Sequence, residues 1–181
     1  MRDSVGLVSD VISIELLLDP ASEALVRADW ERLAAAGHSS MAAHRSVSNR
    51  PHVTLLVRPA AEHALPAALF AAATRLLPVR IALAEPIVFA HGHRAVLARR
   101  IVLSDELRAL HAAVHAAAPA GADAPHTGPD DWTPHVTLAR RLRLDDLDAA
   151  MALLGPSLAG AGVTLRRWDS TVRAVTAIGA G

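Results

Sequence analysis

Cysteine is absent from this sequence of 181 residues, which excludes disulfides, thiolate zinc sites and cysteine nucleophiles. Long apolar runs are missing too, since each falls far short of the about 20 residues that a membrane-spanning helix needs. The first residues, Met1–Ser4, lack the charged start, apolar stretch and cleavage site of a signal peptide. We therefore expect a cytoplasmic protein that makes no contact with membranes.

Net charge and aromatic side chains are scarce as well. The 18 arginines, with no lysine, are balanced by 18 acidic residues, so no overall positive field attracts a nucleic acid. Two Phe, three Trp and no Tyr are few for a protein that follows single-stranded RNA, because such proteins combine stacking aromatics with a basic groove. An anionic substrate must therefore be bound by a local cluster of basic residues. Arginine suits this role, because it makes bidentate contacts with phosphate.

The sequence contains one five-residue motif twice, as Pro51–Leu55 and as Pro134–Leu138. Each copy lies in an apolar, β-branched run that predicts a strand entered from a loop. Side chains at positions i and i+2 of a strand share a face, so His52 lies beside Thr54, and His135 beside Thr137. The alternating Val and Leu side chains face the other way and can be buried. Each copy thus presents one imidazole and one hydroxyl on an otherwise apolar strand.

The remaining pattern predicts an α+β fold with largely antiparallel sheets. Apolar spacing and capping residues predict helices over 20–36, 61–77 with a start that Pro66 moves later, 104–118 and 145–154. Strands are predicted over 11–18, 51–57, 79–83, 86–90, 95–102, the second motif, 163–168 and 171–178. The segment 119–134, rich in Gly, Pro and Asp, is predicted as a loop that is either a functional rim or disordered.

The predicted elements repeat in the same order as the motif does. Each half, about 11–102 and about 104–178, reads helix, motif strand, helix, hairpin. We interpret the chain as one duplicated domain, 1–181, of two lobes related by a pseudo-two-fold axis, with antiparallel sheets lining a central cleft and helices packed outside.

Two imidazoles facing each other across such a cleft can act as a general acid and a general base, because the unperturbed pKa of histidine is near 6.5. The two Thr hydroxyls can hydrogen-bond the non-bridging oxygens of a phosphoryl group. Opening a cyclic phosphodiester needs one activated water and one protonated alkoxide, and it depends mostly on positioning and charge stabilisation. The motif pair therefore favours a cyclic phosphodiester as the target.

These paired motifs, 83 residues apart, resemble the 2H phosphoesterase superfamily and, within it, the LigT-like group of 2′-5′ RNA ligases and RNA 2′,3′-cyclic phosphodiesterases. The resemblance implies a metal-free mechanism with no cofactor, in which His52 and His135 are the acid–base pair and Thr54 and Thr137 bind phosphate. The group continues its second motif as His-x-Thr-x-x-Arg, and this implies a phosphate-binding role for Arg140. Strict strand alternation would place Arg140 on the face opposite to His135, so its reach depends on the strand bending or ending there; the alternative is a solvated charge at the strand end.

Other polar residues carry weaker signals. His44 and Trp132 flank the motifs and could form a substrate rim, although Trp132 is equally well explained as a packed loop anchor. The pairs His91/His93 and His111/His115 have spacings that occur in metal sites, but a hairpin turn and a solvated helix face explain them better.

The sequence thus predicts a metal-independent phosphodiesterase that hydrolyses the 2′,3′-cyclic phosphate of RNA ends or small nucleotides, with reversible 2′-5′ ligation by the same groups. The alternative is a non-catalytic protein that binds RNA ends or nucleotides on the same fold. No obligate protein partner is evident. The symmetric motifs leave open which His is the acid and which is the base.

Overall fold

A computed structural model describes residues 10–59 and 66–179 of the chain. Within these ranges the helices are α1 (Pro20–Ala35), α2 (Ala67–Leu76), α3 (Asp105–Ala117) and α4 (Leu147–Ala152), with short 3₁₀ segments η1 (Met41–Ala43) and η2 (Leu144–Asp146). The strands are β1 (Val11–Leu18), β2 (His52–Pro59), β3 (Val79–His91), β4 (Arg94–Ile101), β5 (His135–Arg143), β6 (Leu158–Asp169) and β7 (Ala174–Ile178). None of the described helices is long and apolar enough to cross a bilayer.

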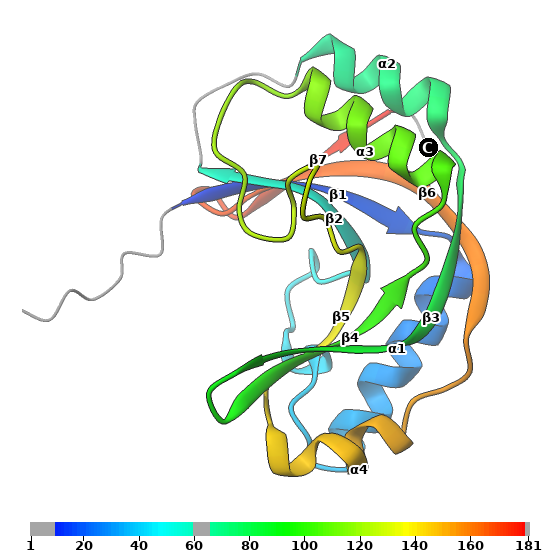
Figure 1. Cartoon of the computed structure of the whole chain (residues 1–181), viewed down its shortest axis with the longest axis vertical. Helices are drawn as coiled ribbons and strands as arrows, with labels where there is room; N and C mark the ends of the chain where they lie inside the picture. The colour runs from blue at the N-terminus through cyan, green and yellow to red at the C-terminus, as the bar shows by residue number, and fades with distance from the viewer. Residues whose placement is uncertain (1–9, 60–65, 180–181) are drawn as a thin grey trace, which may run out of the picture.

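All of these strands belong to one sheet, and every pairing in it is antiparallel. The strand order is β2-β1-β6-β3-β4-β5, with β7 paired to β6 beyond this path. The two motif strands, β2 and β5, are therefore at opposite ends of the order. They nevertheless contact each other, because the sheet curls on itself and brings its two ends together (Figure 1).

Two long strands, β3 and β6, allow this curl. Figure 1 shows both as bent arrows that run from one half of the sheet to the other. β6 comes unusually close to its neighbours: a Cβ at Gly162 would lie 2.4 Å from Leu16 Cδ2, and one at Gly160 would lie 1.9 Å from Ser22 Oγ. Only glycine fits at these two positions, so the small residues in 158–162 permit the close packing of β6 against β1 and the start of α1.

The helices cover the sheet in two pairs (Figure 1). α2 and α3 pack side by side and contact β2, β3 and β7, whereas α1 packs on β5 and β6. α1 is joined to α4, because Arg32 Nε donates to the Leu153 carbonyl over 2.7 Å. Since α1 precedes the first motif in the chain but packs on the second motif strand, each motif depends on residues that are distant in sequence.

Side-chain caps fix where two of these helices begin. The Asp19 carboxylate accepts the N–H groups of Ala21 and Ser22 at the start of α1, and Ser104 Oγ accepts the N–H of Leu107 at the start of α3. Such caps satisfy backbone donors that lack a partner within the helix. Asp19 also accepts the Ala161 N–H, so this cap joins α1 to β6.

The α+β class and the antiparallel pairing are confirmed, but several predicted boundaries are wrong. The interruption predicted at Glu85–Pro86 is absent, because β3 runs through it with an irregular register opposite β4. β6 begins at Leu158 rather than at 163, and β7 begins only at Ala174. The predicted helix 145–154 divides into η2 and α4. Residues 61–65 of the predicted second helix lie outside the described residues, and the division of the chain into duplicated halves stays a prediction.

The loop between α3 and β5 is attached to the sheet at several points. Arg58 Nε donates to Asp123 Oδ1 over 2.7 Å, and the Ala124 N–H donates to the Val57 carbonyl over 2.9 Å. His111 Nε2 donates to the Thr127 carbonyl over 3.0 Å. These bonds fix the loop to β2 and α3, so of the two interpretations of this segment the contacts favour an ordered rim.

Candidate active site

The two motif strands present their side chains in the same way. In β2 and in β5 the first five residues follow one burial pattern, with His and Thr half-buried and the alternating Val and Leu buried. His52 and Thr54 therefore share one face of β2, and His135 and Thr137 share one face of β5. This arrangement follows from strand geometry alone, and it agrees with the sequence prediction.

Each motif imidazole is fixed by the same hydrogen bond. Nδ1 of His52 lies 2.7 Å from the Arg50 carbonyl, and Nδ1 of His135 lies 2.7 Å from the Thr133 carbonyl. A carbonyl oxygen only accepts, so Nδ1 carries a proton in both rings. The other nitrogen, Nε2, is then the one that can take or give a proton.

Two tryptophans join the motif strands crosswise. Trp132, just before β5, donates its Nε1–H to the Thr54 carbonyl in β2, and Trp30 in α1 donates to the Thr137 carbonyl in β5, both over 3.0 Å. Each motif strand thus accepts a hydrogen bond from a tryptophan that lies outside that strand. These bonds contribute to the alignment of β2 with β5.

A bulge in β5 changes where Arg140 points. The register opposite β4 shifts between Leu97 and Ala98, and Leu138 and Ala139 are consecutive buried residues. A bulge places two successive residues on one face and so reverses the alternation that follows. Arg140 therefore lies on the same face as His135, because the strand has the irregularity on which its reach depends.

The first motif has the matching bulge but no matching arginine. The register of β1 with β2 shifts between Ile14 and Glu15, and Leu55 and Leu56 are both buried. Val57 occupies the position in β2 that corresponds to Arg140 in β5. Arg58 instead pairs with Asp123. The two copies of the motif therefore differ in the charge that follows them.

A buried acidic residue accompanies His52. Glu15 lies opposite Thr54 in β1 and is 5% exposed, and its Oε1 is 3.6 Å from Nε2 of His52. Arg166 Nε donates to Glu15 Oε2 and Ser13 Oγ donates to Glu15 Oε1, both over 2.7 Å. Two donors thus hold the carboxylate in place, and a protonated His52 has a counter-ion within reach.

His135 has the opposite surroundings. The Phe89 ring packs against its imidazole with centroids 4.8 Å apart, and Phe89 also contacts the ring of His126. Burial is the largest effect and lowers the pKa of His135 below its usual value near 6.5. The hydrogen bond to the Thr133 carbonyl opposes it, and His52, His126 and Arg140 each lower the pKa by less. His135 therefore favours the neutral form.

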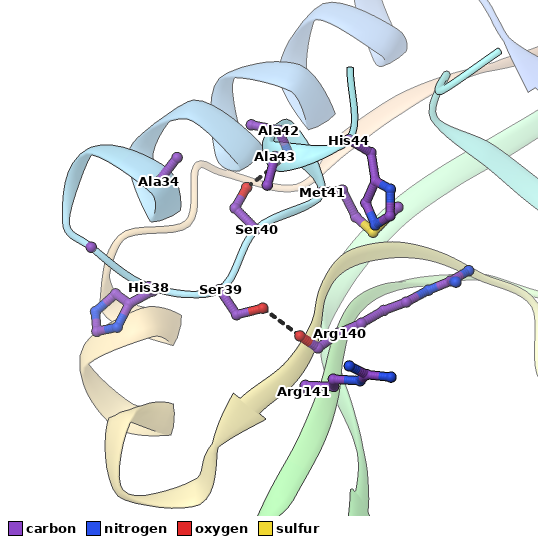
Figure 2. Close-up of a pocket in the computed structure, with 11 residues that line it drawn as sticks. Ala34, His38, Ser39, Ser40, Met41, Ala42, Ala43, His44, Arg140 and Arg141 are labelled. Atoms are coloured by element: carbon purple, nitrogen blue, oxygen red, sulfur yellow. Dashed lines mark hydrogen bonds between the residues drawn. The ribbon is translucent and has the colours of Figure 1, made fainter. Parts of the chain in front are cut away.

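The two residues predicted as a substrate rim have different surroundings. The Trp132 indole stacks on His111 with centroids 3.9 Å apart, and His111 in turn packs on His115. Burial lowers the pKa of His111 to about 4, which keeps the His111 ring uncharged at neutral pH. Trp132 is therefore a packed loop anchor. His44 is exposed and lines a pocket that also contains Arg140 (Figure 2).

The sequence motifs did not point to Glu15, Arg166 or Phe89. Glu15 did give a signal, because it is the one charged residue in the otherwise apolar run Val11–Leu18. The other two gave none, since their neighbours come from distant parts of the chain. Neither histidine pair with metal-like spacing gains further ligands: among the described residues, no three His, Asp or Glu side chains are grouped as a metal site requires.

Two solved structures and one family model match this chain. Two solved structures, of Kluyveromyces marxianus Usb1 with uridine monophosphate and of a protein described only as a phosphoesterase, match with TM-scores of 0.49 and 0.48 and identities of 14% and 18%. The first match covers 94% of this chain and 98% of the other, and the second covers 93% and 94%. No curated protein matches. A family model described as the 2′-5′ RNA ligase superfamily matches residues 20–176, and the chain therefore belongs to this superfamily.

Proposed function

We propose that this protein is a phosphodiesterase that hydrolyses the 2′,3′-cyclic phosphate of RNA ends or small nucleotides, with its two motif histidines as acid and base and without a metal. The observation that carries the proposal is the pair of imidazoles on adjoining strands, each with Nδ1 held by a carbonyl and Nε2 available. Membership of the superfamily supports an enzyme that acts on phosphate esters.

In this mechanism His135 is the base and His52 is the acid. His135 favours the neutral form, so its Nε2 takes a proton from water as the water oxygen attacks phosphorus. The bond from phosphorus to one ribose oxygen then breaks, and His52 gives its Nε2 proton to that oxygen. Glu15 Oε1 lies 3.6 Å from this nitrogen, which places a counter-ion nearby yet beyond hydrogen-bonding distance, so the proton stays available. Solvent returns both rings to their starting forms.

Charge on the phosphoryl group increases during the attack, and three side chains can stabilise it. The hydroxyls of Thr54 and Thr137 share faces with the two histidines, and the bulge places Arg140 on the face of His135. Preformed donors of this kind act most strongly where the charge develops. When a 5′-hydroxyl attacks phosphorus in place of water and the bond to the 3′ oxygen breaks, the same opening of the ring would join the two ends by a 2′-5′ linkage.

Phosphorus NMR tests the proposal directly. A nucleoside 2′,3′-cyclic phosphate incubated with the protein in a chelator such as EDTA is expected to convert to a monophosphate, and the product resonance identifies the 2′ or 3′ isomer. Turnover that stops in chelator would exclude the metal-free mechanism. Binding of the nucleotide without any turnover would instead support the non-catalytic alternative.

The pH dependence of kcat/KM is expected to reflect the lowered pKa of His135. A base acts in its neutral form, so the acidic limb of the profile should lie below pH 6.5, the usual value for histidine. In Arg140→Gln one neighbouring positive charge is lost, and the limb should move upward toward that value. An acidic limb that keeps its position in Arg140→Gln while kcat/KM falls would show that Arg140 does not act on His135.

A further inference from the structure

A pocket beside the proposed active site is lined by positively charged and polar residues. It has a volume of about 710 Å³ and lies between the end of α1, the segment through η1, and β5 (Figure 2). Four of its residues carry or can acquire positive charge, and none of its residues is acidic: His38, His44, Arg140 and Arg141. In a chain whose net charge is zero, this is a local concentration of positive charge of the kind that an anionic ligand needs.

Hydrogen bonds hold the wall of this pocket in place. Ser39 Oγ donates to the Arg140 carbonyl, and Ser40 Oγ donates to the Trp30 carbonyl over 2.6 Å. Asn49 Nδ2 donates to the carbonyls of Met41 and His44 over 2.9 and 2.8 Å. The pocket is therefore formed before any ligand arrives, and a volume of this size is in the range of small-molecule sites.

Arg141 owes its place to an unusual backbone conformation. Its φ is 59°, in the left-handed region that residues other than glycine seldom adopt. Its carbonyl accepts a hydrogen bond from Arg94 Nη1 over 2.9 Å, and this bond fixes it against β4. Arg140 and Arg141 are consecutive and both exposed, so they can contact two different groups of one ligand. Arg141 also lines a second pocket, next to Phe89.

We propose, building on the function above, that this pocket binds the phosphate and nucleoside next to the cyclic phosphate, so that the preferred substrate is an oligonucleotide end rather than a free cyclic nucleotide. Arg140 joins the two sites, because it lies on the face of His135 and lines the pocket. Arg141 contacts the adjoining phosphate, with His44 beside it. Met41, with Ala42 and Ala43, gives the pocket an apolar part for the base or ribose.

Kinetics with two matched substrates test this inference. The kcat/KM is measured for a nucleoside 2′,3′-cyclic phosphate and for a trinucleotide that ends in the same cyclic nucleotide, at low and high salt. The trinucleotide should be preferred by about tenfold or more, and salt should reduce this preference, because ions screen exposed charges. Arg141→Gln should remove most of the preference through a higher KM for the trinucleotide, with a much smaller effect on the mononucleotide.

The control is Arg108→Gln, which removes the same charge from an exposed position on α3 and should leave both values unchanged. Equal kcat/KM for the two substrates, or equal losses for both in Arg141→Gln, would overturn the inference.

If neither substrate is turned over, the proposed function fails, and the pocket is then tested by measuring the binding of a trinucleotide 3′-phosphate. In that measurement Arg141→Gln should lower the slope of log Kd against log salt by about 0.7, the value for one lost contact with single-stranded phosphate. An unchanged slope would overturn the inference.

Discussion

Alanine in place of His135 or His52 is expected to lower kcat for a 2′,3′-cyclic nucleotide by about 10²–10⁴-fold, the range that general acid–base groups contribute. His135→Ala removes the group that takes the proton of the attacking water, and His52→Ala removes the group that protonates the leaving oxygen. Both side chains are half-buried rather than in the core, so the fold should tolerate the change. Steady-state kinetics give the loss, and circular dichroism with the unfolding midpoint confirms the fold.

A phosphodiester with a nitrophenolate leaving group separates the two roles. This leaving group departs without a proton, so His52→Ala should recover much of its activity on such a substrate, whereas His135→Ala should not. The opposite pattern of rescue would reverse the assignment of acid and base. In Glu15→Gln, loss of the carboxylate that faces His52 should affect turnover of the natural ester more than turnover of the activated one.

Asp29→Ala is expected to lower the free energy of unfolding by about 3–5 kcal/mol, because it leaves a buried guanidinium without its partner. Asp29 is 0% exposed and Arg99 is 1% exposed, and Arg99 Nε lies 2.5 Å from Asp29 Oδ2. The carboxylate also accepts hydrogen bonds from Arg32 and from the Gly155 N–H. These contacts join α1 in the first half of the chain to β4 and to the segment after α4. Urea unfolding measures the change.

Two further variants complete this measurement. One is a control in an exposed ion pair, and the other removes both charges of the buried pair. Arg80→Gln breaks an ion pair with Glu106 in which both partners are exposed, and it should leave the unfolding curve unchanged, because water and salt screen such pairs. Asp29→Leu combined with Arg99→Met removes both charges and should recover part of the stability lost in Asp29→Ala. An Asp29→Ala protein as stable as the wild type would show that the pair contributes nothing to the fold.

Much of the site followed from local rules. A repeated motif of alternating apolar and polar residues predicted two strands with His and Thr on one face, and β2 and β5 have that form. The motif also predicted the family, which the family model confirms over residues 20–176. The boundaries of β3 and β6 were harder to predict, because pairing with neighbouring strands continues both strands past a proline or a glycine that would end an isolated one.

The sequence alone determined which side chains each motif strand presents together on one face, because strand alternation depends only on the geometry of neighbouring residues. The difference between the two histidines was decided by tertiary structure. Glu15 reaches His52 from β1, Phe89 reaches His135 from β3, and the bulge that turns Arg140 toward His135 arises in the pairing of β5 with β4. The electrostatic environment of a side chain depends on all the charges, dipoles and apolar groups that folding places around it. Two identical five-residue motifs therefore acquire different surroundings only once the sheet has curled.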